Sequence, residues 1–168
     1  MKNILLALTI LVIVSCSSKS EQKDYNSIFN QYSKKFVLEW WKKHPVWAMY
    51  SGYYNYDSIL PIQTESKRTE LLSFYKSKLN ELHLIEPDSL SSSNYTDYRI
   101  IENQLNSSTW YLKEFKSYEW DPSSYNVGGS LALIINGNYA DKESRYNSIF
   151  VKLKNVPEFY MNAKRSLK

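Results

Sequence analysis

The residues that most readily do chemistry in proteins are sparse in this chain. Its two histidines are His44 and His83, and His83 and Glu86 have the His-x-x-Glu spacing of an inverted zinc motif. Pro87 stands where that motif requires a second histidine, and His44 precedes Pro45, where a structural or solvent-exposed role is commoner than ligation. Because no third ligand accompanies either histidine, we predict no metal site, no cofactor and no catalytic residue within this chain.

Two carboxylates, Glu119 and Asp121, flank Trp120. Such a pair beside an aromatic ring can serve glycoside hydrolysis, but residues two apart on a turn are more often a solvated pair. The chain also lacks the Gly-x-Ser-x-Gly pattern of a serine hydrolase and a Gly-rich phosphate loop before a helix. These motifs therefore give no support for glycosidase, serine hydrolase or nucleotide chemistry.

The N-terminal segment has the pattern of a processed export signal. Lys2 is followed by an apolar run over residues 4–14, too short for a transmembrane helix, and then by Ser15 and Cys16, the only cysteine. The sequence Ile-Val-Ser-Cys looks like a bacterial lipobox, in which the cysteine thiol receives diacylglycerol and becomes the first residue. The alternative is an ordinary secreted protein with a buried or chance cysteine.

We therefore predict a signal peptide over residues 1–15 and a lipidated, flexible tether over residues 16–24. The polar sequence after Cys16 has no apolar periodicity, which is typical of a flexible tether. Ser17 replaces the aspartate that retains some lipoproteins at the inner membrane, which favours the outer membrane without fixing the leaflet. The expected location is the bacterial cell envelope, with membrane lipid as the partner of Cys16.

Composition favours a helical fold and argues against nucleic acid as a partner. The net charge is only +4 and is evenly spread. Aromatic residues make up 15% of the chain, enough for a core, and only 4 glycines occur. With little strand-like alternation, these features predict an all-α, irregular multi-helix fold.

An aromatic stretch at residues 38–60 is the expected centre of the fold. Apolar spacing predicts a long helix that ends at Lys43, a break at the next two residues, a short helix over 45–51 and a stop at Gly52. Trp40 and Trp47 are the candidates for deepest burial. The following tyrosines, Tyr53, Tyr54 and Tyr56, suit a wet cleft and an interface equally well.

Helical periodicity continues after that stretch. It predicts helices over residues 64–82, 95–115, 141–156 and 158–168, with Asn94 as an N-cap and Pro157 at a junction. Period alone cannot distinguish a helix from a strand at residues 131–135, and a short helix is preferred because no partner strand is visible. On the helix over 141–156, Tyr146, Ile149, Phe150 and Leu153 share one apolar face.

Four groups of spaced residues carry a family resemblance. They are Phe36, Trp40, Trp41, His44, Pro45, Ala48, Gly52, Tyr56, Asp57 and Leu60; Leu90, Ser91, Asp97 and Tyr98; Trp120, Asp121, Pro122, Tyr125 and Asn126; and Leu153, Val156, Pro157, Tyr160, Ala163 and Leu167. Taken in order, the series resembles the N-terminal signature of the domain of unknown function 885 (DUF885) family, large bacterial proteins of which many are lipoproteins.

The resemblance implies an all-helical fold related to zinc metallopeptidases of the gluzincin type. It implies a downstream His-Glu-x-x-His helix and a zinc-bound water that hydrolyses peptide or amide bonds. This chain ends before such a helix, so the resemblance implies that residues 25–168 wall or cap a substrate cleft. The candidates for lining that cleft are His44, Tyr53, Tyr54, Trp120, Tyr125 and Asn126.

Two functional hypotheses follow. Because Lys168 closes an expected helix without a stop signal, the first is that the chain is the N-terminal portion of a membrane-anchored zinc-peptidase-like lipoprotein. The absent C-terminal catalytic part and a peptide substrate would be its partners. The alternative is a stand-alone, non-catalytic lipoprotein that binds peptide or glycan through tyrosine and tryptophan side chains.

Overall fold

The computed structural model describes residues 23–168, and every regular element in that range is helical. The predicted signal peptide, Cys16 and all but the last two residues of the tether lie outside the described residues. The elements are α2 (Tyr25–Lys43), α3 (Pro45–Tyr50), α4 (Glu65–Leu82), η1 (Pro87–Ser89), α5 (Ser92–Trp110), η2 (Tyr111–Phe115), α6 (Ser117–Trp120), η3 (Pro122–Tyr125), α7 (Gly128–Asn136) and α8 (Lys142–Ser166). The predicted all-α fold is confirmed.

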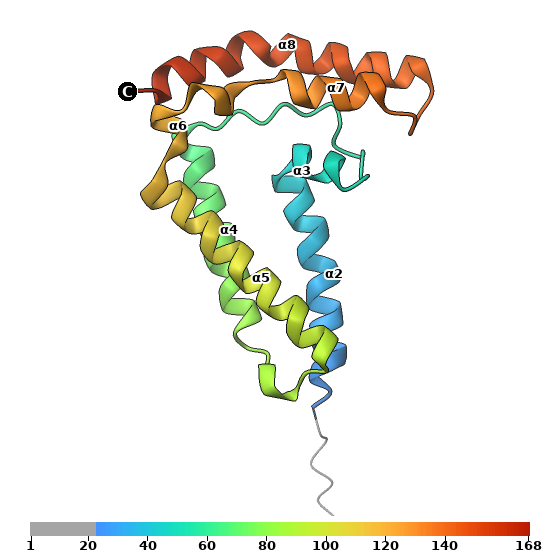
Figure 1. The fold of residues 1–168 in the computed structure, drawn as a ribbon, viewed down its shortest axis with the longest axis vertical. Coiled ribbons are helices and arrows are strands. Elements are labelled where there is room, and N and C mark those ends of the chain that lie inside the picture. The colour runs from blue at the N-terminus through green and yellow to red at the C-terminus, as the bar shows by residue number, and fades with distance from the viewer. Residues whose placement is uncertain (1–22) are drawn as a thin grey trace, which may run out of the picture.

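The helices form two parts that meet at one end of the molecule. Figure 1 shows α2, α4 and α5 as a long bundle, with α7 and α8 side by side across its end. Helix α3 continues from α2 and contacts α7, while α6 and η3 contact α8. The chain passes between the two parts through the connection 51–64 and the segment from η2 to η3.

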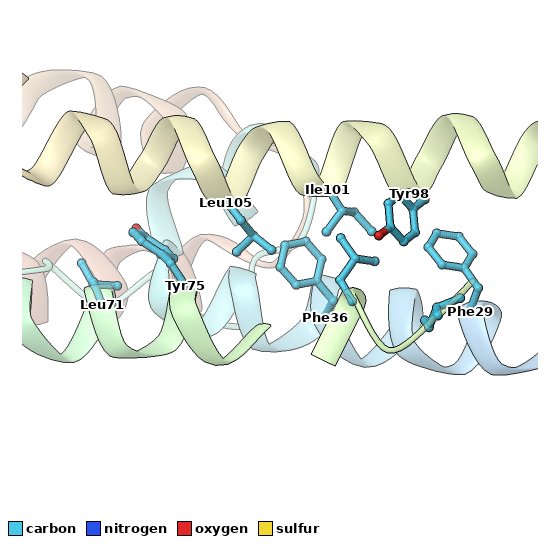
Figure 2. Close-up of a cluster of buried hydrophobic side chains, with 9 residues drawn as sticks. Phe29, Phe36, Leu71, Tyr75, Tyr98, Ile101 and Leu105 are labelled. Atoms are coloured by element: carbon cyan, nitrogen blue, oxygen red, sulfur yellow. The ribbon is translucent and has the colours of Figure 1, made fainter. Parts of the chain in front are cut away.

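The main core lies inside the long bundle. Its buried residues recur at helical spacing on α2, α4 and α5, with one more residue, Ile85, in the loop after α4. They are Phe29, Phe36, Leu71, Tyr75, Leu82, Ile85, Tyr98, Ile101 and Leu105. Figure 2 shows Phe29 and Tyr98 at one end of this cluster and Leu71 and Tyr75 at the other. Burying one large apolar side chain contributes about 1.5–3 kcal/mol, so this cluster is the main source of stability.

The predicted break after Lys43 is confirmed. Pro45 cannot donate a backbone hydrogen bond, so α2 ends at Lys43 and α3 begins with the proline in its first turn. Gly52 then has φ of 80°, a conformation that glycine adopts freely, and the chain turns there as predicted. Helices α4 and α7 also confirm the helices predicted at 64–82 and 131–135.

Trp47 was expected to be deeply buried, and this prediction is wrong. Its side chain is 65% exposed, because Pro45, Ala48 and Met49 form the inward side of α3. Trp40 is half-buried and packs against the bundle core. A short helix on the surface of a bundle buries only one of its sides. In α3 that side carries residues smaller than tryptophan.

The predicted start of the third helix is also wrong. Helix α5 begins earlier, because Ser91 is the N-cap and its hydroxyl accepts the backbone N–H of Asn94 at 3.3 Å. The Asn94 side chain instead donates to Asn26 Oδ1 at 2.9 Å and so ties α5 to α2. At the other end, α5 runs into the π-helical turn η2, and Lys116 reverses the chain with φ of 48°.

Pro157 was expected at a junction between two helices, but α8 is continuous through it. A proline inside a helix removes one hydrogen bond and crowds the preceding turn. Contacts on both sides of Pro157 hold α8 together: Arg145 donates to the carbonyls of Ile134 and Ile135, and Phe159 packs edge-on against Tyr125. The proline itself faces solvent.

The apolar face predicted on this helix is largely exposed. Tyr146, Phe150 and Leu153 face solvent, and only Ile149 of the four predicted residues is half-buried. The inward side of α8 carries Lys152 and Ala163 instead. The apolar stripe of α8 thus has no partner among residues 23–168, and we call Tyr146, Phe150, Leu153 and Met161 the outer face of α8.

Candidate functional site

A cavity of about 430 Å³ lies where the long bundle meets α7 and α8. Its tyrosines come from five separate segments, namely α3, α4, η2, α6 and η3. They are Tyr50, Tyr75, Tyr111, Tyr118 and Tyr125, and we call this space the tyrosine cavity. Leu60, Leu71, Leu112 and Phe159 add apolar surface to its wall. Its size and its mixture of apolar wall with a few polar groups are typical of ligand sites.

His44 lies at the base of the tyrosine cavity. Its Nε2 is 3.1 Å from the Tyr75 hydroxyl, and its ring lies against Trp40 with 4.2 Å between the ring centroids. Burial, aided by the neighbouring charge of Lys43, lowers the pKa of His44 to about 4. The imidazole is therefore neutral near pH 7. The Nε2 atom of His44 is hydrogen-bonded to the Tyr75 hydroxyl. Burial raises the pKa of Tyr75 above its ordinary value.

A second cavity of about 460 Å³ lies on another side of the same histidine. Trp40, Trp41 and Trp47 line it, together with polar side chains of α5. His44, Tyr75 and Tyr111 line both spaces and form the wall between them. A change in His44 would therefore alter both cavities.

Arg68 supplies the positive charge of the tyrosine cavity. Among the described residues that line this cavity it is the only one with a formal charge at neutral pH. Its guanidinium lies over the Tyr118 ring, 4.1 Å from the centroid, and one nitrogen donates to the backbone carbonyl of Gln63. Asn162 donates to the same carbonyl at 3.0 Å, so α8 also helps to fix this corner.

Three of the six predicted cleft residues line the tyrosine cavity, and each of the three is hydrogen-bonded within the protein. The Tyr125 hydroxyl donates to the Tyr118 carbonyl at 2.7 Å. Asn126 Oδ1 accepts the backbone N–H of Gly128 at 2.8 Å, at the start of α7. The third residue is His44. Their roles toward a ligand remain predictions.

The other three predicted residues lie elsewhere. Tyr53 stacks on Trp41, with 4.6 Å between centroids, and Tyr54 stacks face to face on Tyr139. Trp120 is exposed, and its indole N–H donates to the Phe115 carbonyl at 2.9 Å. None of the three lines the tyrosine cavity, although Tyr54 borders a separate shallow hollow beside α7.

Sequence reasoning missed most of the cavity wall. Tyr75 lies on the buried stripe of α4, and its hydroxyl also reaches His44 in the cavity wall. Arg68 is of a residue type that normally predicts exposure. Beyond the family resemblance, which singles out His44, Tyr125 and Asn126, the sequence signal for this wall is the abundance of tyrosine.

The described residues do not fit a zinc site. Among residues 23–168, no three His, Cys, Asp or Glu side chains gather in a way that could hold a metal ion. His44 Nε2 is paired with the Tyr75 hydroxyl, and His83 Nε2 lies 3.0 Å from Glu102 on α5. We therefore derive no metal-dependent step from these residues. Over the same range, no helix combines the length and apolarity needed to cross a bilayer.

The fold and the cavity define an all-helical domain with an aromatic-walled site between a helix bundle and a crossing pair of helices. Residues 45–168 match the family of bacterial proteins of unknown function known as DUF885, and the chain belongs to this family. The predicted family is thereby confirmed.

A solved structure shares this fold, and it is described as that of a putative lipoprotein of unknown function from Shewanella oneidensis. It is 39% identical in sequence, with a TM-score of 0.80 over 83% of this chain. The match covers 26% of that protein, so this chain spans about a quarter of its length. No curated protein matches the chain.

Proposed function

We propose that this chain is the N-terminal part of a lipid-anchored envelope protein of the zinc-peptidase type, and that its helices wall a substrate cleft. The observation that carries the proposal is the tyrosine cavity. Its tyrosines come from five elements, and its wall contains several hydroxyl groups and Arg68, a cation with no carboxylate partner among residues 23–168. The neighbour from Shewanella oneidensis supports it, because the same helices are part of a much longer chain there.

In this proposal, zinc and the water that it activates belong to the downstream half of the family domain. The described residues bind and orient the substrate, while the metal polarises the scissile bond elsewhere. The test is a peptidase assay of this chain with added zinc and a library of unstructured peptides. We expect no turnover above the zinc-only control. Zinc-dependent hydrolysis by this chain would contradict the assignment of catalysis to the downstream part of the family domain.

The lipid anchor is proposed from Cys16 and is supported by the neighbour, which is a putative lipoprotein. Two or more acyl chains hold a protein stably on a membrane, whereas one chain is marginal. The test is metabolic labelling with a tagged fatty acid in a bacterial host, followed by separation of inner and outer membranes. We expect label in the outer-membrane fraction, absent from the Cys16→Ser variant. Label that persists in Cys16→Ser would contradict the anchor.

One observation favours the alternative of a stand-alone binding lipoprotein. Trp110, Tyr111, Phe115 and Trp120 form a group of exposed rings around η2, with neighbouring centroids 5.0–5.4 Å apart. Exposed aromatic rings of this kind can hold sugars or peptide side chains. Glycan and peptide arrays with this chain alone test it. Binding that is lost in Trp120→Ala and retained in Trp47→Ala, an exposed tryptophan on α3, favours the alternative.

A further inference from the structure

The tyrosine cavity contains two polar groups whose bonding capacity the protein leaves unused. Gln63 Oε1 is buried and has no hydrogen-bond partner among residues 23–168. A buried acceptor without a donor destabilises a fold, because it has lost its bond to water without replacing it. Arg68 donates one bond to the Gln63 backbone, and no carboxylate of the described residues forms an ion pair with it. Both residues line the cavity.

The charge of Arg68 acts on Glu119, but Glu119 is bonded to another cation. Glu119 accepts a hydrogen bond from Lys168 Nζ at 2.7 Å. This bond is the main reason that the pKa of Glu119 lies below its usual range, and the charge of Arg68 contributes less. The guanidinium therefore has no carboxylate partner among residues 23–168, and it lies on the face of Tyr118 in the wall of the cavity.

We propose that the tyrosine cavity binds the C-terminal residue of a peptide whose last side chain is aromatic. The terminal carboxylate pairs with Arg68, the backbone N–H of the same residue donates to Gln63 Oε1, and the side chain lies among the tyrosines. This inference rests on the proposed function and names the ligand of that cleft.

The two residues lie together in the cavity wall, because the Arg68 guanidinium donates to the backbone carbonyl of Gln63. In a C-terminal residue, the carboxylate and the backbone N–H are attached to the same α-carbon, so neighbouring residues are needed to bind both. Guanidinium is the preferred partner of a carboxylate, since its N–H groups match both oxygens. Tyr111, Tyr118 and Phe159 supply ring faces and edges on which an aromatic side chain packs.

The test is calorimetric titration of the chain, residues 1–168, in detergent with four probes. They are a tripeptide acid ending in phenylalanine, the same tripeptide with a C-terminal amide, the acid ending in glycine, and free phenylalanine. We expect the phenylalanine acid to bind at least tenfold more tightly than its amide, equivalent to about 1.4 kcal/mol. The glycine acid should also be weaker. Binding of free phenylalanine as tight as the tripeptide would overturn the peptide assignment and leave an amino-acid site.

The matched variants are Arg68→Gln and Arg99→Gln. Arg99 lies on α5 outside the cavity, where it pairs with Glu102. Arg68→Gln should bind acid and amide alike, while Arg99→Gln should keep the tenfold preference. Gln63→Leu, which fills the same space without an acceptor, should weaken the acid and the amide equally. If Arg68→Gln does not fold, the acid preference of the unchanged chain should still shrink as salt rises from 0.05 to about 0.5 M.

Equal binding of acid and amide by the unchanged chain would overturn the carboxylate assignment and leave the cleft-wall proposal standing. No binding of any probe by the folded chain would overturn this inference as well. Zinc-dependent hydrolysis by this chain would contradict the assignment of catalysis to the downstream part without affecting the ligand assignment, so the two failures are distinguishable.

Discussion

At the scale of single residues, His44 connects the core to both cavities. Its imidazole touches Trp40 on one side and the Tyr75 hydroxyl on the other. Because the ring is largely desolvated there, its proton affinity is lower than in the unfolded chain. The fold should therefore be sensitive to acid at this position.

We expect stability to fall as the pH drops from about 6.5 to about 4. In that window the unfolded chain binds a proton at His44 that the folded chain excludes, and above it the two states bind equally. The full loss is about 3 kcal/mol at most. Urea unfolding at pH 7 and pH 4.5 measures it. Between these two pH values, His44→Phe should lose less unfolding free energy than the unchanged chain. His83→Gln should lose as much as the unchanged chain. An unchanged pH dependence in His44→Phe would contradict the assignment.

Lys152 is buried like His44, but unlike His44 it keeps its positive charge at neutral pH. Its side chain is 1% exposed, and its ammonium has Met49 Sδ at 3.5 Å as its hydrogen-bond partner. Burial lowers the pKa of Lys152 to about 8, although the charge of Asp57 partly opposes the shift. Lys78, also buried, differs because Glu39 and Glu81 lie 2.7 and 2.8 Å from its nitrogen.

We expect Lys152→Met to stabilise the fold at pH 7, by up to about 3 kcal/mol. Below pH 8 the folded chain must keep a buried ammonium, and the penalty shrinks as the pH rises from about 8 toward 10.5. The gain of Lys152→Met should thus be smaller at pH 9.5 than at pH 7. Lys154→Met, at an exposed position of α8, is the control. A destabilised Lys152→Met would show that the amine has a partner that compensates its burial.

These residues also show the limit of sequence reasoning. Phe29, Phe36 and Leu71 could be assigned to buried stripes, because helical spacing alone brings them to one side. Lys152 could not, because its type predicts exposure and only the packing of α8 on α3 and the loop after it buries the amine. The same holds for Arg68, whose place in the cavity wall has no local signature in the sequence.

At the scale of elements, local signals decide where most helices begin. Asp24, Thr64, Ser91 and Asp141 each accept the backbone N–H three residues later. The start of α5 was misplaced because two good caps, Ser91 and Asn94, lie three residues apart. Only the structure shows that Asn94 bonds to Asn26.

We expect Ser91→Ala to destabilise the chain by about 1 kcal/mol, the usual value of a helix N-cap. Ser93→Ala, at an exposed position inside the same first turn, should be neutral or stabilise by a few tenths of a kcal/mol, because alanine has the higher helix propensity. Thermal or urea unfolding followed by far-UV circular dichroism measures both. Equal costs for the two variants would refute the assignment of Ser91 as the cap.

Helix α8 shows why an element's length is harder to predict than its type. Pro157 is a strong local stop signal, and the expected junction follows from it. The helix continues because its two halves are anchored separately, by Arg145 to the end of α7 and by Phe159 to Tyr125. Such anchors come from distant residues and have no local signature.

At the scale of the whole molecule, the outer face of α8 has no partner among residues 23–168. Tyr146, Phe150, Leu153 and Met161 follow helical spacing and lie exposed together on one helix. Contiguous apolar surface of this kind commonly marks a contact with another protein part. The fold class and the family could be predicted from the sequence. The tyrosine cavity could not, because it exists only after α3, α4, the segment from η2 to η3, α7 and α8 have packed together.

We expect residues 17–168, produced without the lipid, to self-associate through the outer face of α8. Sedimentation velocity over a hundredfold range of concentration measures it. The double variant Tyr146→Glu and Phe150→Glu should sediment as a monomer, because two charges on that face resist burial. Leu84→Glu, at an isolated exposed residue, should associate like the unchanged chain. A concentration-independent monomer without any substitution would contradict the expectation.

The stacked pair of Tyr54 and Tyr139 has a spectroscopic consequence. The ring centroids are 3.6 Å apart and the planes differ by 2°, and Asp57 accepts hydrogen bonds from Tyr139 and Ser148 beside them. Two chromophores held parallel at this separation share their electronic excitation. The near-ultraviolet dichroism of the folded protein should therefore contain a coupled tyrosine signal, which Tyr139→Leu removes. That signal would report, without any added label, when the loop after α3 docks on the turn before α8.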